Sequence, residues 1–366
     1  MKPNLLIISN YRDPIAPIRP EAEIILRLKK EGYTITVMTP MDGYYPTKLM
    51  ESGCYIIDHL PSGKFERKTI DLIKHAVAQE RIDIIHAFNS KAIANAAWAV
   101  WGNKKVKLVS YRGYTGNIHW YDPTNYISFL NPRINFMVCL AESVREMYLK
   151  NGVASDRAIT INKGHDPAWY ADAQAADLSE FAFPADALVC ALVANYRTKM
   201  KGIRYLVEAA SLLPKESKVH FLMIGKGLRS KEIEPLLKLK PVENRFTFTG
   251  FRADAPNLVK ASDVSISASL FGEATQKAVI EAMNLGNPMI ITDISGNRGL
   301  VKDGISGYVV PPADGLAIRD ALIKLEEDAS LRSRMGEEAK RHIAQFLSID
   351  RSVKEYAQFY DRIGSE

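Results

Sequence analysis

The chain has 366 residues, of which 47% are hydrophobic and 25% are charged, and its formal net charge is +6. This length fits two domains of about 150–200 residues each better than a single core. The sequence contains no low-complexity tract, no repeat of solenoid length and no apolar run long enough to cross a bilayer. We therefore expect a folded protein of two domains, and not a solenoid or a membrane-spanning protein.

Apolar runs of strand length alternate with amphipathic runs of helix length up to about residue 170. The first apolar run is short and follows a single lysine, which is typical of a β-strand and not of a signal peptide. The predicted strands are residues 5–9, 33–39, 54–60, 82–88, 107–111, 136–141 and 158–162. The predicted helices are residues 19–32, 67–80, 90–102 and 142–152. Short continuous strands separated by helices indicate a parallel sheet that is covered on both faces.

A segment rich in Ala, Asp and Pro, residues 166–186, lacks periodicity and is predicted to be a linker. A second alternating series follows it. Its predicted strands are residues 187–194, 219–225, 246–250, 263–269, 288–292 and 307–312. Its predicted helices are residues 202–213, 230–239, 275–286, 315–327 and 330–363. The predicted fold class is therefore α/β, with two doubly wound Rossmann-like domains in tandem.

We expect a first domain at residues 1–172 and a second at residues 173–346, with a helix at residues 347–366 that crosses back to the first domain. In doubly wound sheets, ligands bind beyond the carboxyl ends of the strands, at the point where the strand order reverses. Two such domains facing a central cleft would each hold one substrate. This architecture suggests a two-substrate enzyme, although a fold does not define a function.

The stretch FGEATQKAVIEAMNLGNPMI, residues 271–290, places seven residues between Glu273 and Glu281 at the start of a predicted helix. A glutamate near a helix N-terminus complements the helix dipole, so a capped surface helix is the simplest alternative. The surrounding motifs argue for more. They are NYRTKMKG at 195–202, MIGKG at 223–227, FTGF at 248–251 and GLVKDGISGYVV at 299–310. In this order they resemble the retaining GT-B glycosyltransferases of the E-x7-E group, glycosyltransferase family 4.

The resemblance implies a nucleotide-sugar donor and gives both glutamates a role. Glu281 would bind the ribose diol, because a carboxylate accepts two hydrogen bonds. Glu273 would contact hydroxyls of the hexose and stabilise an oxocarbenium-like transition state. The helix start between them would offer free backbone N–H groups to the diphosphate. The residues of this helix start are Ala274, Thr275, Gln276 and Lys277.

Arg197 and Lys201 match the basic pair of the family, and Lys199 is a rival for the second position. Two cations beside a departing diphosphate stabilise the negative charge that develops on it. The alternative is a solvated basic turn. Further residues at strand ends are assigned to nucleotide-sugar binding by the resemblance: Gly225, Gly250 and Phe251.

The sequence has no D-x-D motif, and none of its seven histidines lies at a metal-ligand spacing. Glycosyltransferases of the other common fold use a D-x-D motif to hold a metal on the diphosphate. The resemblance therefore implies no metal and no cofactor, with the basic pair neutralising the leaving group.

The resemblance is looser in the first half, which would bind the acceptor. The acceptor-side candidates are Arg19, His86, Asn89, Tyr114 and His119. His86 and Asn89 end a predicted strand, and residues 111–123 are rich in aromatic and glycine residues that suit sugar stacking. A satisfied structural histidine and a plain loop are the alternatives. The Phe-Asn pair at residues 88–89 is similar to one in lipopolysaccharide-core glucosyltransferases of the family, which suggests work on envelope polysaccharide.

The positive charge is concentrated in the first half. Residues 1–170 hold 22 Lys and Arg against 16 Asp and Glu, whereas residues 171–366 hold 26 of each kind. A solvated basic face is one explanation, and contact with an anionic phospholipid surface or a phosphorylated acceptor is the other. No arginine-rich run or RNA-binding aromatic motif indicates nucleic acid. Three isolated cysteines are typical of a reducing cytoplasm.

The predicted function is that of a cytoplasmic, metal-independent, retaining hexosyltransferase that works peripherally at the inner face of the cytoplasmic membrane. It would move a hexose from a nucleotide sugar, by preference a UDP-sugar, to a hydroxyl of a cell-envelope glycan or glycolipid, in lipopolysaccharide or polysaccharide biosynthesis. Two alternatives stay open: a transferase of the same fold with a small soluble acceptor, and a non-catalytic partner that binds nucleotide sugars.

Overall fold

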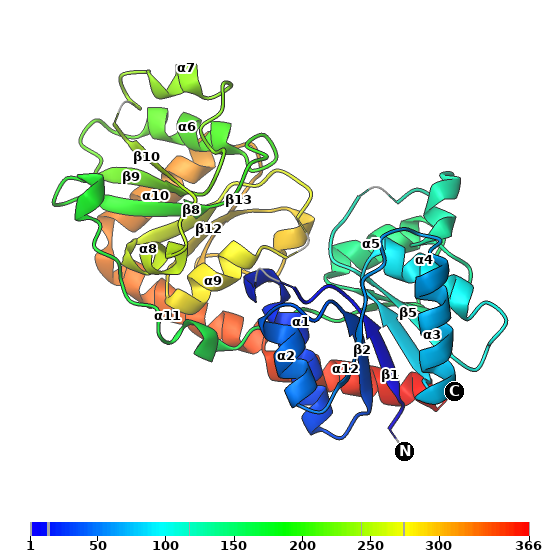
Figure 1. Cartoon of the computed structure of the whole chain (residues 1–366). Coiled ribbons are helices and arrows are strands. Elements are labelled where there is room, and N and C mark those ends of the chain that lie inside the picture. Colours follow the sequence, from blue (N-terminus) through cyan, green and yellow to red (C-terminus); the bar gives the residue numbers. More distant parts are fainter. Residues whose placement is uncertain (1, 13–14, 117, 243, 274, 366) are drawn as a thin grey trace. The chain divides into compact units, whose positions relative to one another are not determined.

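The computed structural model describes residues 2–12, 15–116, 118–242, 244–273 and 275–365. The chain divides into two compact units, the first formed by residues 1–164 together with 349–366, and the second by residues 165–348. Each unit is an α/β structure (Figure 1). The sequence prediction set the first boundary after residue 172. The units part at residue 165 because the His165 N–H donates to the Leu347 carbonyl (2.7 Å), which ties this segment to the second unit.

The first unit contains a seven-stranded sheet in the order β3-β2-β1-β4-β5-β6-β7, with all neighbours parallel. Its strands are β1 (Leu5–Ile8), β2 (Ile35–Thr39), β3 (Tyr55–Asp58), β4 (Ile84–Ala87), β5 (Lys107–Arg112), β6 (Phe136–Cys139) and β7 (Ala158–Thr160). Its helices are α1 (Ile15–Lys30), α2 (Tyr44–Glu51), α3 (Arg67–Gln79), α4 (Ser90–Ala99), α5 (Glu142–Lys150) and α12 (Ile349–Gly364). Helix α1 packs against α2 and α12, and α3 packs against α4. Strands β1 and β2 lie between these two groups (Figure 1).

The second unit contains a six-stranded parallel sheet in the order β10-β9-β8-β11-β12-β13. Its strands are β8 (Leu188–Val193), β9 (Val219–Ile224), β10 (Phe246–Gly250), β11 (Val264–Ser267), β12 (Met289–Thr292) and β13 (Gly307–Val310). Its helices are α6 (Ile203–Leu212), α7 (Glu234–Leu237), α8 (Ala255–Ala261), α9 (Lys277–Leu285), α10 (Gly315–Glu327) and α11 (Ala329–Phe346). In both sheets the strand order reverses next to the first strand, between β1 and β4 and between β8 and β11. Ligand sites are expected at these positions.

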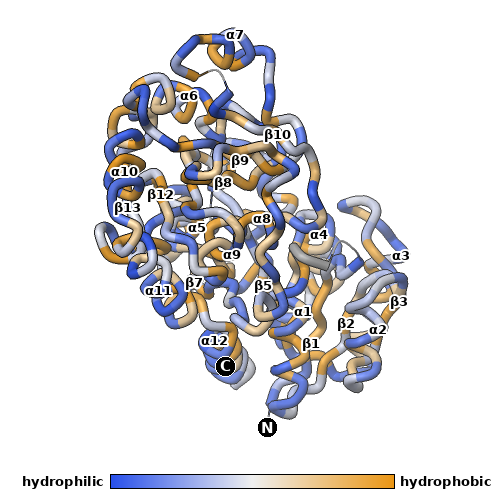
Figure 2. The backbone as a smooth tube through the Cα atoms, turned by 90° about the vertical axis from the view of Figure 1, so that its left-hand side faces the viewer, coloured by the Kyte–Doolittle hydropathy of each residue, from blue (hydrophilic) through white to orange (hydrophobic). Residues whose placement is uncertain are grey.

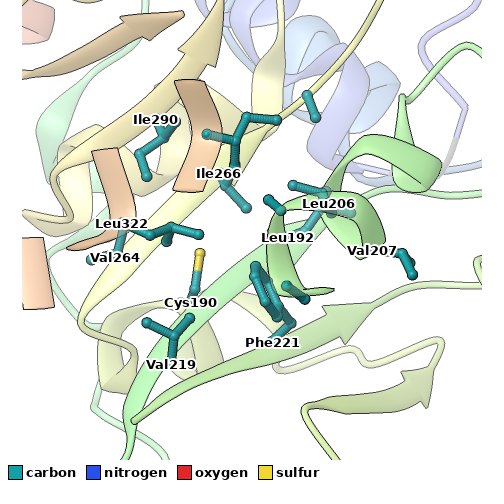
Figure 3. Close-up of a cluster of buried hydrophobic side chains, with 14 of the residues drawn as sticks. Cys190, Leu192, Leu206, Val207, Val219, Phe221, Val264, Ile266, Ile290 and Leu322 are labelled. Atoms are coloured by element: carbon teal, nitrogen blue, oxygen red, sulfur yellow. The ribbon is translucent and has the colours of Figure 1, made fainter. Parts of the chain in front are cut away.

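Strand β8 is buried on both faces. Cys190 and Leu192 point into one apolar cluster, where they meet Phe221 of β9 (Figure 3). Their neighbours Val189 and Ala191 belong to a second cluster. Because successive strand residues point to opposite faces, a strand in the middle of a covered sheet is expected to be mainly apolar at successive positions. This explains the continuous apolar run of β8, and Figure 2 shows the same hydrophobic character along β1.

Helix α12 completes the first unit. The Ser352 hydroxyl donates to the Asn162 carbonyl (2.7 Å), and the same oxygen accepts from the Gly164 N–H (2.9 Å). Further along α12, the Tyr360 hydroxyl forms a hydrogen bond with His86 Nδ1 (2.7 Å). His86 is fully buried in β4, and this burial lowers the pKa of its imidazole to about 3. The imidazole is therefore neutral, and Tyr360 joins α12 to the middle of the sheet.

The link between α12 and β4 predicts the effect of Tyr360→Phe. This substitution leaves His86 Nδ1 buried without its partner, so the free energy of unfolding should fall by about 1–3 kcal/mol. Urea denaturation followed by circular dichroism measures this loss. Tyr55→Phe is the control, because Tyr55 is 59% exposed. Equal stability of the two variants would show that the hydrogen bond contributes nothing.

Candidate functional site

Two loops of the second unit meet where its strand order reverses. One follows β8 and spans residues 194–201, and the other follows β11 and spans residues 268–276. Parallel pairing of β8 with β11 brings the two loops to the same edge of the sheet. There the Lys201 ammonium donates to Glu273 Oε1 (2.6 Å), and the Ser269 hydroxyl donates to the same oxygen (3.1 Å). The structure thus brings together Lys201 and Glu273, two of the three predicted catalytic residues.

The close approach of these loops depends on a glycine. Gly202 has a φ of 66°, and a Cβ at this position would lie 2.0 Å from the Ala268 carbonyl oxygen. Two residues earlier, the Met200 carbonyl accepts a hydrogen bond from the Leu270 N–H (2.8 Å). No residue with a side chain fits at position 202 without moving the loops apart, so this glycine sets the distance between Lys201 and Glu273.

The loop after β8 has a strained backbone. Tyr196 and Arg197 have φ values of 48° and 52°, in the left-handed region that residues other than glycine seldom adopt. Backbone hydrogen bonds from the Tyr196 N–H to the Lys226 carbonyl (2.7 Å) and from the Lys201 N–H to the Arg197 carbonyl (2.9 Å) hold this conformation. Such outliers concentrate at functional sites. The Arg197 side chain is exposed, and its guanidinium makes no hydrogen bond or ion pair with the residues that the structure describes.

A buried hydrogen-bond network lies beneath Glu273. Gln276, which is 5% exposed, accepts from the Ser267 hydroxyl (2.6 Å) and donates to Asn297 Oδ1 (2.6 Å). Asn297 in turn donates to the Thr292 carbonyl (2.8 Å). The Gln276 side-chain amide is thus engaged inside the protein, and the prediction for this residue concerns only its backbone N–H. Polar residues within otherwise apolar strands, such as Ser267 and Thr292, were the sequence signal that could have revealed this network.

Helix α9 begins at Lys277, two residues later than the predicted start at Thr275. Thr275 therefore precedes the helix and Gln276 is its N-cap, while Ala274 lies outside the described residues. Within the helix, the Lys277 ammonium donates to Glu281 Oε1 (2.5 Å). The side chain of Glu281 is 22% exposed, so its carboxylate keeps access to solvent.

The glycines predicted at strand ends lie together beyond β9 and β10. The Gly225 N–H donates to the Gly250 carbonyl (2.8 Å). Gly225 has a φ of 131°, and a Cβ there would lie 1.7 Å from the Ala194 carbonyl oxygen, so only glycine fits. Phe251 is 63% exposed, and the Lys226 ammonium lies 5.5 Å from the centre of its ring. These residues and the loop after β8 thus occupy neighbouring positions at one edge of the sheet.

The two candidate lysines line different hollows. Lys201 borders a cavity with Ser267 and Gln276, beside the network under Glu273. Lys199 borders another, which it shares with Arg204 and Tyr205 on the side of α6.

The acceptor-side candidates of the first unit do not form one cluster around His86. His86 is fully buried against Tyr360, so the expectation that it faces a ligand cleft is wrong. Asn89 caps α4, where its side chain accepts from the N–H groups of residues 91 and 92. Arg19 lies inside α1 and does not open it as predicted.

The aromatic segment at residues 111–123 is more open. Tyr114 is 49% exposed and lies against the Arg112 guanidinium, 3.7 Å from the ring centre. The His119 imidazole is exposed and stacks on Tyr121 at a centroid distance of 5.1 Å. Both side chains are accessible to a ligand.

Among the residues that the structure describes, no group of three or more His, Cys, Asp and Glu side chains is placed to hold a metal ion. No helix among the same residues is long and apolar enough to cross a membrane.

The fold is that of a GT-B protein. Anabaena HepE, solved in complex with UDP, superposes with a TM-score of 0.77 at 18% identity, over 97% of this chain and 99% of that one. Residues 177–342, which lie within the second unit, match the family model "Glycosyl transferases group 1".

Two relatives each match slightly less than half of the chain. The α-D-kanosaminyltransferase of Streptomyces kanamyceticus is 29% identical over 167 residues, which are 45% of this chain and 43% of the relative. An Escherichia coli protein, UDP-Gal:α-D-GlcNAc-diphosphoundecaprenol α-1,3-galactosyltransferase, is 27% identical over 164 residues, or 44% and 42%. The chain thus matches less than half of the length of each of these two relatives.

The position of Gly296 predicts a second stability effect. A Cβ on this residue would lie 2.2 Å from the Glu273 carbonyl oxygen. Gly296→Ala should therefore push the loop that carries Glu273 outward and lower the free energy of unfolding by about 1–3 kcal/mol. Gly102→Ala is the matched control, since no atom lies within 4 Å of its added methyl group. Denaturation curves that coincide for the two variants would contradict the predicted clash.

Proposed function

We propose that the protein is a retaining, metal-independent hexosyltransferase of glycosyltransferase family 4. It would transfer a hexose from a nucleotide sugar, a UDP-sugar by preference, to a hydroxyl of a cell-envelope glycan or glycolipid. The observation that carries the proposal is the 2.6 Å contact between Lys201 and Glu273. It places a cation and a carboxylate side by side where the strand order reverses, in a domain that matches the group 1 family model.

The carboxylate suits the sugar and the cation suits its leaving group. Glu273 is 14% exposed, and its contacts with Lys201 and Ser269 both use Oε1, so Oε2 can accept hydrogen bonds from hexose hydroxyls. Its charge would also stabilise an oxocarbenium-like transition state. The Lys201 ammonium has three N–H donors and can bind a phosphate oxygen while it keeps Glu273. Arg197, exposed in the same loop, would supply the second cation.

The nucleotide would occupy the neighbouring strand ends. Glu281 would accept from the ribose diol, and the N–H groups at the start of α9, near Lys277 and Thr275, would face the diphosphate. Gly225, Gly250 and Phe251 would lie along the nucleoside. The solved UDP complex of Anabaena HepE, a protein of the same fold, supports the choice of a uridine nucleotide.

The acceptor is the less specified partner. The excess charge of residues 1–170, with 22 cationic and 16 acidic side chains, favours an anionic acceptor or membrane surface. The name of the Escherichia coli relative specifies a diphosphoundecaprenol acceptor, which supports a lipid-linked glycan. We therefore assign the protein to the inner face of the cytoplasmic membrane as a peripheral enzyme. Arg19, Asn89, Tyr114 and His119 stay acceptor-side candidates.

Glu281→Ala tests the donor site. Loss of hydrogen bonds from a charged group should weaken UDP binding by about 1.5–3 kcal/mol, or roughly 10- to 150-fold in Kd, while the helix is retained because Ala is a good helix former. Isothermal titration calorimetry measures the change. Glu355→Ala is the control, because Glu355 forms an ion pair of the same i,i+4 spacing with Arg351 on α12. An unchanged Kd for Glu281→Ala would remove Glu281 from the nucleotide site.

Lys201→Ala tests the departure of the diphosphate. It should lower kcat by roughly 100-fold or more, as loss of a transition-state donor does, and Lys199→Ala should be mild. Turnover should persist in excess chelator, and the product should keep the anomeric configuration of the donor in its NMR spectrum. Reversed effects of the two lysines would move the basic pair to Arg197 and Lys199. Activity that requires added magnesium or manganese would disprove the metal-independent mechanism, and UDP binding without any turnover would favour a non-catalytic partner.

A further inference from the structure

Three large aromatic side chains form an exposed cluster on the first unit, whereas the residues proposed to bind the donor belong to the second. Phe65 is 56% exposed, Trp98 51% and Trp101 55%. Their rings touch in sequence. Phe65 meets Trp98 edge-on at a centroid distance of 5.7 Å, and Trp98 stacks on Trp101 at 6.0 Å. Contiguous exposed aromatic surface of this kind usually marks an interaction site.

The turn that carries Trp101 is held rigid from beneath. Arg133 donates to three carbonyl groups around this turn, at Val100 (2.8 Å), Asn103 (2.7 Å) and Val106 (2.6 Å). The segment that carries Phe65 is fixed to α4 in the same way. Asn95, fully buried, accepts from the Glu66 N–H (2.8 Å) and donates to the Gly63 carbonyl (2.7 Å). The cluster is therefore presented on an ordered backbone, and the exposure of its rings is built into the fold.

The charged residues next to the cluster in the sequence are mainly cationic, although Arg67 forms an ion pair with Asp71 (3.8 Å). Residues 84–121 contain no Asp or Glu at all, and they include Trp98, Trp101 and five cationic residues. Of these, Lys104 and Lys105 are exposed directly after the Trp101 turn. Phe65 lies in the sequence KFERK, residues 64–68. The one carboxylate in this sequence, Glu66, is turned inward to the Ser62 N–H and the Thr69 hydroxyl.

We propose that this cluster of Phe65, Trp98 and Trp101 is the surface by which the protein binds an anionic phospholipid bilayer. Tryptophan rings are amphipathic and favour the depth of lipid headgroups, and lysines beside them attract anionic lipids. The stacked tryptophans supply the interfacial aromatic rings of such a surface, and the flanking lysines supply its positive charge. The inference deepens the membrane contact in the proposed function, since it names the face that makes it.

Vesicle co-sedimentation of the full-length protein tests the proposal. Wild type should bind vesicles of phosphatidylcholine mixed with phosphatidylglycerol much more strongly than vesicles of phosphatidylcholine alone. The double substitution Trp98→Ser and Trp101→Ser should lower the partition coefficient by at least about tenfold for each ring removed. A tenfold change requires that only about 55 Å² of each ring is buried in the bilayer. Lys104→Gln with Lys105→Gln should lower it about fivefold per charge, and this effect should vanish at high salt.

Tyr55→Ser is the matched control, because Tyr55 is equally exposed on the edge strand β3 of the same unit. Vesicle binding by the double tryptophan variant at the level of Tyr55→Ser would overturn the proposal. So would a loss of self-association, or of affinity for a soluble glycan, without a change in vesicle binding. UDP calorimetry on the same samples separates the two proposals. If the double tryptophan variant binds UDP normally but loses vesicle binding, both proposals are supported. If the wild type binds vesicles but not UDP, the lipid-binding surface is supported and the proposed donor site is contradicted.

Discussion

The parallel pairing of β8 with β11 is the contact on which the candidate site depends. These strands are neighbours in the sheet although more than sixty residues separate them, and the connections from each leave in opposite directions. The loops that follow both strands meet at the edge between them. Lys201 and Glu273 come from these two loops. Their contact is therefore a property of the sheet topology and not of local sequence.

The site combines a rigid base with a strained rim. Below Glu273, at the carboxyl edge of the sheet, the Gln276 amide accepts a hydrogen bond from Ser267 and donates one to Asn297. Both ends of this buried amide therefore have a partner. A buried network of this kind holds one arrangement, because any other would leave a polar group unpaired. Above it, the left-handed residues Tyr196 and Arg197 keep two side chains exposed at the rim. An ordered carboxylate next to exposed cationic groups suits a substrate that carries both a sugar and a diphosphate.

The sequence predicts the architecture well, because burial on both faces of a parallel sheet leaves continuous apolar runs. Every strand of both units falls within or next to a predicted run. Helix α2 escaped prediction, since its eight residues include Tyr44, Tyr45 and Pro46 and carry little helical periodicity. The direction in which polar side chains point was harder to predict. His86 was predicted to lie on the acceptor side, yet its ring is turned inward by a partner far away in the chain, Tyr360.

Helix α12 has a consequence for the order in which the protein matures. The first unit closes only when residues 349–364 dock on it, and these leave the ribosome after the whole of the second unit. Until then the face of the sheet beside α1 stays uncovered, and the buried imidazole of β4 lacks its tyrosine. The second unit is one continuous stretch of chain, residues 165–348, and all of it is synthesised before α12. Domains ordinarily fold from the N-terminus onward during synthesis. Here the nascent chain can complete its second unit before its first, so a chain truncated after residue 348 would contain every part of the second unit and an incomplete first unit.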